Sequence, residues 1–178
     1  MDIQQFWQLI GEARMRVPAP DNGSAVAEQA TALLALLPAE EIVVAERILW
    51  GLMADSYRAP LWGAAYMING GCSDDGFDYF RGWLITQGRE TFERVIADPD
   101  ALADLPAVRA FAAGGIDIEC EEALVIAWDA HQAVTGEELP VDGLVINYPT
   151  LDPDWNFDFG DRDELSSRLP RLATLYRH

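Results

Sequence analysis

Lysine is absent from this chain of 178 residues. Its 12 basic residues are all arginine and face 30 Asp and Glu residues, which gives a formal net charge of −18. Without lysine the protein cannot bind nucleotide phosphates through a P-loop ammonium group, form a lysine Schiff base or use a lysine general base. The acidic excess also opposes binding to the phosphate backbone of nucleic acid, because affinity for this backbone comes largely from clustered Lys and Arg. We therefore expect no duplex nucleic acid as a partner.

Cysteine and histidine are also scarce. The two cysteines, Cys72 and Cys120, are too few for a disulfide framework, and no C-x-x-C spacing occurs. No signal peptide pattern opens the chain, and no apolar run approaches the roughly 18 residues of a membrane span. The motifs G-x-G-x-x-G, G-x-S-x-G and H-E-x-x-H are missing. The sequence predicts a cytoplasmic protein with no membrane attachment, no metal site and no cofactor.

Half of the residues are hydrophobic and 10% are aromatic, so the chain has enough apolar surface to fold by itself. Apolar residues recur at helical spacing, with capping residues and prolines between the runs. We expect helices over residues 3–16, 25–37, 39–58, 60–68, 74–88, 90–97, 107–112 and 119–134, and one or two short helices within 161–176. This pattern predicts a mainly α fold.

The C-terminal part has a different pattern. Gly143–Tyr148 is typical of a short strand, and Asp154–Phe159 alternates strictly between polar and aromatic residues. We expect a short β-strand pair here, in which Trp155, Phe157 and Phe159 share one face. No repeat or linker divides the chain. The sequence therefore predicts a single domain over 1–178, with a helical body at 1–136 and a strand-containing lid at 137–178.

The most distinctive stretch is residues 69–89, NGGCSDDGFDYFRGWLITQGR. It resembles the signature of an uncharacterised bacterial family, domain of unknown function 4240. The resemblance extends to Phe6-Trp7, to the segment around Trp62 and to Glu119-Cys120-Glu121, and so covers about three quarters of the chain. It implies a mostly helical bacterial domain, sometimes attached to other modules. The family offers no established activity or site residue to transfer.

Within this stretch, Asp74, Asp78 and Arg81 share one face of the predicted helix. A carboxylate pair oriented by an arginine could hold a metal ion or serve as acid and base. The same residues are equally typical of acids that complement a helix dipole and of an intrahelical salt bridge, and we favour this structural interpretation. Glu119 borders the apolar arc of its own predicted helix and needs a partner, for which an arginine of residues 69–89 is a candidate.

Two further residues have both a chemical and a structural interpretation. Cys72 precedes a helix start that could lower its thiol pKa and make it a nucleophile, but a small buried thiol packs equally well there. His131 shares a helical face with apolar residues, so we expect a core histidine with its hydrogen bonds satisfied rather than a ligand.

Without catalytic motifs, the sequence favours a non-enzymatic role as a protein-interaction or ligand-binding module, whose partner and oligomeric state it leaves open. Arginine and aromatic residues commonly anchor partners, which makes Arg81, Trp155, Phe157 and Phe159 candidate binding residues. The alternative is a carboxylate-based hydrolase, with or without a divalent cation, that uses Asp74, Asp75, Asp78 and Glu119. A second alternative is an acidic inhibitor or nucleic-acid mimic.

Overall fold

The fold is built from helices, which the computed structural model describes for residues 1–114, 118–140 and 146–176. The α-helices in these ranges are α1 (Ile3–Arg16), α2 (Gly23–Leu34), α3 (Ala39–Asp55), α4 (Ala59–Asn69), α5 (Asp74–Thr86), α6 (Arg89–Ala97), α7 (Pro106–Gly114), α8 (Ile126–Thr135), α9 (Arg162–Arg168) and α10 (Pro170–Leu175). Three short 3₁₀ helices join them: η1 (Pro99–Asp104), η2 (Glu121–Val125) and η3 (Pro153–Trp155). The prediction of a mainly α fold is confirmed.

Local hydrogen bonds determine where several helices begin and end. The side chain of Asp2 accepts from the N–H of Gln5 in a capping box at the start of α1, and Ser73 accepts from the N–H of Gly76 at the start of α5. Gly70 and Gly136 adopt positive φ and terminate α4 and α8. Ser73, Gly70 and Gly136 are helix ends that the sequence pattern indicated, and most predicted boundaries agree to within three residues.

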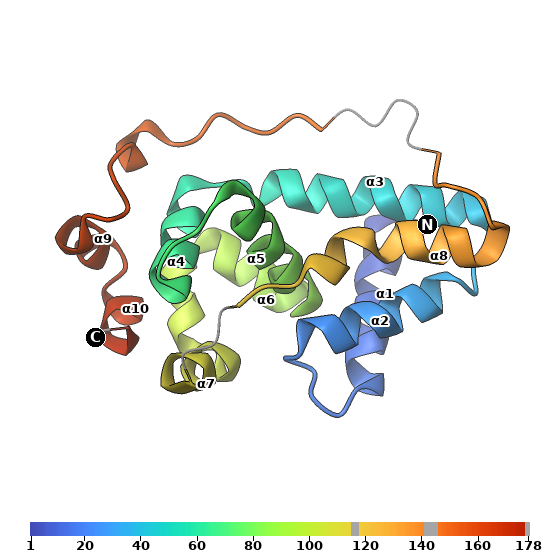
Figure 1. Cartoon of the computed structure of the whole chain (residues 1–178), viewed down its shortest axis with the longest axis horizontal. Helices are drawn as coiled ribbons and strands as arrows, with labels where there is room; N and C mark the ends of the chain where they lie inside the picture. Colours follow the sequence, from blue (N-terminus) through green and yellow to red (C-terminus); the bar gives the residue numbers. More distant parts are fainter. Residues whose placement is uncertain (115–117, 141–145, 177–178) are drawn as a thin grey trace.

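The helices bury one continuous set of apolar side chains, in which α5 is central. α8 lies along α3 and α2, and α2 packs on α1 and α5 (Figure 1). Phe77, Phe80 and Leu84 of α5 are fully buried, as their positions on one arc of the helix predicted. The predicted helix over 119–134 differs, because Glu119 precedes a turn of 3₁₀ helix and the α-helix begins only at Ile126.

The predicted β-strand pair is wrong. Residues 143–145 of its first strand lie outside the described residues, and the described part of the chain contains no strand. Pro149 and Pro153 lack the N–H that a strand ladder requires. Backbone donors after them bond locally instead, since the N–H of Trp155 donates to Asp152 O at 3.0 Å and that of Asn156 to Pro153 O at 3.1 Å.

The alternation within residues 154–159 still determines which side chains face the helices. Trp155, Phe157 and Phe159 pack partly buried against the apolar core, while Asn156 and Asp158 between them are exposed. Alternate side chains therefore face inward here without strand hydrogen bonds. From residue 146 the chain passes α3 and α4 as an extended segment and then continues into α9 and α10 (Figure 1).

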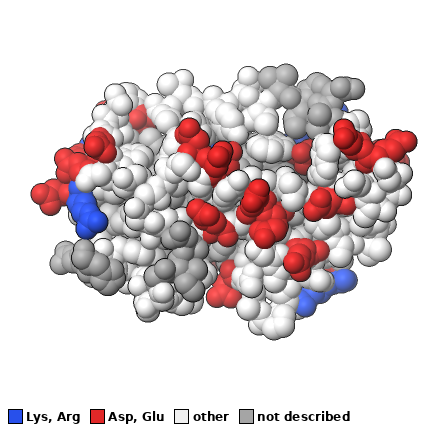
Figure 2. Space-filling view, in the orientation of Figure 1, with Lys and Arg blue, Asp and Glu red and all other residues white. Residues whose placement is uncertain are grey.

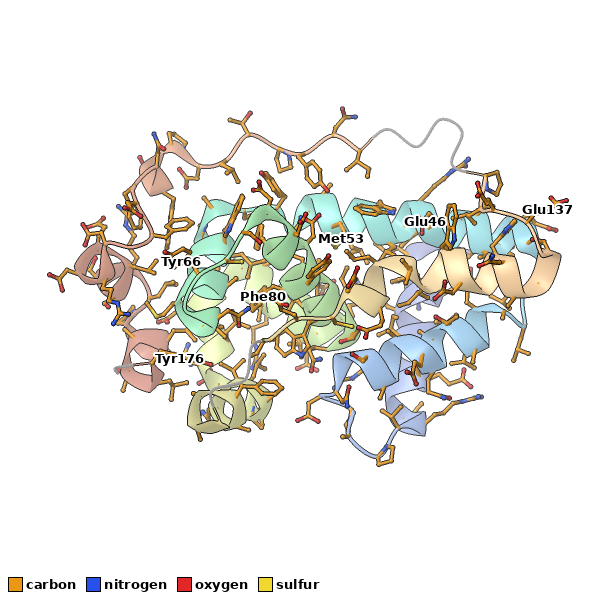
Figure 3. The ribbon with its side chains drawn as sticks, viewed as in Figure 1. Glu46, Met53, Tyr66, Phe80, Glu137 and Tyr176 are labelled. Carbon is orange, nitrogen blue, oxygen red and sulfur yellow. The ribbon has the colours of Figure 1, made fainter. Side chains whose placement is uncertain are left out.

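Residues from η1 and α7 attach the end of the chain to the helices. The buried carboxylate of Asp100 accepts from the N–H groups of Arg171 and Leu172, at 2.9 to 3.1 Å, and so caps α10 from a distant part of the sequence. The Tyr176 hydroxyl donates to Val108 O at 3.1 Å (Figure 3). Leu172 is fully buried. None of the helices described here has the length and hydropathy needed to span a membrane.

Candidate functional site

Arg81 is fully buried in the middle of α5, although it is charged. Its guanidinium is satisfied on three sides, because Nε donates to Phe77 O at 3.3 Å, Nη1 donates to Met53 O and Nη2 donates to the carboxylate of Asp78. Met53 lies near the end of α3, so this arginine ties α3 to α5. A buried charge with this many acceptors is a stable arrangement.

Aromatic rings cover the same guanidinium. Its central carbon lies 4.7 Å from the ring centroid of Phe77, 5.2 Å from that of Tyr57 and 5.6 Å from that of Tyr148. At these distances the cation is attracted by the negative faces of the rings. The positive charge of Arg81 is therefore balanced by Asp78 and covered by aromatic rings within the protein.

The other predicted acidic candidates lie around this arginine in different positions. Asp78 forms the ion pair with Arg81, and its side chain is 33% exposed. Asp74 and Asp75 are exposed in the first turn of α5, where they complement the helix dipole. Glu119 is exposed and approaches α5 at Gly76, where its Oε1 would lie 3.4 Å from a Cβ added to that glycine. The structure thus joins Asp78 to Arg81 and places Glu119 against an earlier turn of the helix.

The surroundings of Cys72 do not favour a nucleophile. Burial and then the negative charge of Glu119 raise the pKa of its thiol to about 12, while Arg81 opposes this rise. The thiol is consequently protonated at neutral pH. His131 is buried, and its Nδ1 lies 3.1 Å from Glu137 O and 3.2 Å from the hydroxyl of Thr135. These contacts agree with the structural interpretation of both residues.

Carboxylates are not gathered into a metal-binding group in residues 1–114, 118–140 and 146–176. No set of three or more His, Cys, Asp or Glu side chains in these ranges could hold a metal ion. Several acids of the C-terminal segment instead accept local backbone hydrogen bonds. Asp152 accepts from Asp154 N at 2.9 Å, Asp158 from Gly160 N at 2.8 Å and Asp161 from Glu164 N at 3.1 Å.

A cavity of about 790 Å³ lies beside the Arg81 cluster, between α4 and the C-terminal segment. One wall comes from residues 57–72 and the other from residues 149–159. Six aromatic side chains dominate the lining: Tyr57, Trp62, Tyr66, Trp155, Phe157 and Phe159. The volume falls within the range of roughly 300 to 1,000 Å³ that small-molecule sites occupy. This cavity, formed by described residues, is a candidate binding site.

Ring contacts hold both walls in place. On the first wall Trp62 stacks on buried Phe77 at 4.7 Å between centroids, and its indole N–H donates to Cys72 O at 3.1 Å. On the second wall the rings of Trp155 and Phe157, and those of Phe157 and Phe159, lie 5.9 and 5.4 Å apart. The lining is therefore ordered by its own packing.

The two walls also meet directly. Tyr66 lies on the side of α4 toward the C-terminal segment (Figure 3), and its ring centroid is 6.0 Å from that of Phe159. Trp155 packs on α4 at Gly63, where a Cβ would approach its ring to 3.0 Å. A glycine at this helix position lets the indole lie against the backbone. The cavity depends on this close approach of two distant segments.

A family model covers the whole of the first cavity wall. The model for a protein of unknown function, DUF4240, matches residues 1–133. The chain belongs to the DUF4240 family. The DUF4240 region contains α5, Arg81 and the first cavity wall, whereas residues 149–159 lie beyond it. No curated protein and no solved structure matches the chain significantly.

The candidate binding residues identified from the sequence reach the site in different ways. Trp155, Phe157 and Phe159 line the cavity, while Arg81 lies behind its wall, over the ring of Tyr57. Tyr57 and Tyr66 were not among the candidate residues that the sequence pattern indicated. Both follow ordinary helical spacing, and only the return of the C-terminal segment to α4 gives them a role.

Proposed function

We propose that this DUF4240 protein is a ligand-binding module whose ligand occupies the cavity between α4 and residues 149–159. The observation that carries the proposal is the cavity of about 790 Å³ with its six aromatic side chains. Burial of aromatic surface against a ligand is a large source of binding free energy. The ligand is of small-molecule size, because the open cavity between the walls has a volume of that order.

The state of the aromatic side chains favours a small ligand over a protein partner. Trp155, Phe157 and Phe159 are each partly buried by packing on the chain itself. An interface residue that anchors a protein partner is generally presented at the surface. We keep the cytoplasmic location as part of this proposal, in agreement with the two free cysteines.

The other two functions have less support. The carboxylate-based hydrolase would need Asp74, Asp75, Asp78 and Glu119 to act together. Asp78 is instead paired with Arg81, and Asp74 and Asp75 are exposed at the helix start. An acidic inhibitor or mimic is consistent with Figure 2, in which acidic side chains are spread over the face shown and few arginines appear. No particular spacing of these acids favours that function.

The proposal is tested with the neutral fluorophore N-phenyl-1-naphthylamine, whose emission rises in apolar sites. We expect saturable binding with Kd below about 100 μM, accompanied by energy transfer from tryptophan. Asn156→Trp places a bulky side chain at an exposed lining position and should weaken binding at least about tenfold, because it fills the cavity.

The matched control is Asn147→Trp. Asn147 is exposed on the same segment but does not line the cavity. Both variants should retain the helical circular dichroism spectrum of the wild type, and Asn147→Trp should bind the fluorophore like the wild type. Equal binding by all three proteins, or no binding by the wild type, would contradict the proposed function.

A further inference from the structure

The charge of the cavity lining points to a class of ligand. Its described lining residues include two carboxylates, Asp152 and Asp158, and no Arg, Lys or His. Both carboxylates lie on the second wall, among Trp155, Phe157 and Phe159. An anion entering this cavity would meet negative charge and the negative faces of aromatic rings.

Two arginines lie against rings of the cavity lining, and each of them is paired with an acid. Arg81 lies over Tyr57 and is paired with Asp78. Arg168 lies 5.0 Å from the ring centroid of Trp155 and 4.9 Å from that of Phe157, and it is paired with Glu164 at 2.6 Å. Each arginine is thus balanced by an acid of its own helix. Asp152 and Asp158 are the charged side chains of the described lining.

Rings that line the cavity already hold cations within the protein. The ring of Tyr57 makes a cation–π contact with Arg81, and the rings of Trp155 and Phe157 make such contacts with Arg168. Trp62, Tyr66 and Phe159 line the same cavity and are not in contact with either guanidinium among the cation–ring pairs described. These three rings are the ones that remain for a cation from outside.

We infer that the ligand is a small organic cation, an alkylated ammonium carried on a compact apolar body. This inference rests on the proposed function and adds the charge of the ligand to it. The rings of Trp62, Tyr66 and Phe159 would surround the ammonium group, and Asp152 and Asp158 would supply the counter-charge. An ammonium group without N–H donors suits this lining, since aromatic faces attract it without hydrogen bonds.

A pair of probes with the same shape isolates the charge. Choline carries a trimethylammonium group, and 3,3-dimethylbutan-1-ol is its uncharged analogue with carbon in place of nitrogen. Both are titrated into the full chain while the indole and amide NMR signals are recorded. We expect choline to shift the signals of Trp62 and Trp155 and to bind at least about tenfold more tightly than the alcohol. Added salt should weaken the binding of choline and leave the binding of the alcohol unchanged.

The double variant Asp152→Asn and Asp158→Asn tests the counter-charge. Asparagine keeps a side-chain oxygen that accepts the same local N–H bonds, so the turns should persist. The matched control is Asp154→Asn with Asp163→Asn, which removes the same charge from exposed positions outside the lining. We expect the first double variant to lose about tenfold in choline affinity and the control to lose little.

The outcomes separate this inference from the proposed function. Equal affinity for choline and the alcohol would overturn the inference that the ligand is a cation, and the cavity would remain a proposed apolar binding site. Binding of the fluorophore without displacement by either probe would also overturn the cation inference and leave the proposed function standing. Failure of the fluorophore and of both probes to bind would overturn both proposals. Equal losses in the two double variants would show that only the overall charge matters, which also overturns the inference.

Discussion

Arg81 shows how a residue that looks like part of a reactive site can hold a fold together. Its three donors bond to Met53 O, Phe77 O and Asp78, and its planar face is covered by the rings of Tyr57 and Tyr148. Only a planar, forked cation can do both at once. The residue links the end of α3 and the middle of α5 to the wall of the cavity.

The Arg81 site predicts that lysine cannot replace arginine. Arg81→Lys should lower the free energy of unfolding by about 3 kcal/mol, because one ammonium group cannot reach acceptors on two helices and stack on rings. Arg81→Met should cost a similar amount, since Asp78 would lose its ion-pair partner and Met53 O would keep only the Ser56 hydroxyl as a side-chain donor. Urea denaturation followed by circular dichroism measures both.

Asp78→Asn is the control for the ion pair alone. Asparagine can still accept from Arg81, and the site is partly exposed to water. We expect a loss of about 1 kcal/mol. If Arg81→Lys were as stable as the wild type, the structural role assigned to this arginine would be wrong.

Helical spacing predicted part of this environment. It placed Asp78 and Arg81 one turn apart and so indicated their salt bridge. It could not show that Arg81 is buried, because Tyr57 and Tyr148 come from sequence positions that are 24 residues before and 67 residues after it. A helix wheel describes the faces of one helix and contains no information on what covers them.

At the scale of elements, the contact between α5 and the chain before α8 is unusually close. The N–H of Cys120 donates to Tyr79 O at 3.0 Å, and a Cβ on Gly82 would lie 2.7 Å from Cys120 O. Glycine is a poor residue for the interior of a helix, so its presence here needs a reason. The close approach of the Cys120 backbone provides one.

Gly82→Ala should therefore destabilise the protein even though alanine is the better helix former. The methyl group meets a backbone oxygen, which cannot move without shifting η2, and we expect a loss of about 2 kcal/mol or more. Gly51→Ala is the matched control at an exposed position of α3, where nothing lies within 4 Å of the new Cβ.

The control should gain about 0.5 to 1 kcal/mol from helix propensity alone. Thermal unfolding of both variants gives the comparison, and a gain in stability for Gly82→Ala would contradict the packing described for α5 and Cys120.

The helices could be predicted because their signals are local. Caps such as Asp2 and Ser73 and the glycines that end α4 and α8 act within one turn of the chain. Local signals could not decide whether the strand pair forms. Alternation in residues 154–159 correctly indicated that the aromatic side chains face one way, but a strand also needs a partner for its backbone, and Pro149 and Pro153 work against one.

For the molecule as a whole, the cavity exists because the end of the chain returns to its middle. One wall is formed by residues 57–72 and the other by residues 149–159, and η1 and α7 fix the helices that follow the second wall. No sequence pattern joins segments this far apart. Trp155, Phe157 and Phe159 of the second wall could be identified as candidates from the sequence, whereas the role of the first-wall aromatic residues and the cavity itself appear only in the fold.

Asp100 is the residue on which this arrangement depends most directly. Asp100→Ala removes the acceptor of the Arg171 and Leu172 N–H groups and should cost about 1 to 3 kcal/mol. Because α10 anchors the segment that forms the second wall, we also expect faster hydrogen exchange in residues 153–175 and weaker fluorophore binding, with exchange in α2 and α8 unchanged. Asp104→Asn removes surface ion pairs with Arg171 and Arg109 and leaves the α10 N–H acceptor in place, so it serves as the control. If Asp100→Ala left both exchange and binding as in the wild type, the cavity would not depend on the attachment of α10.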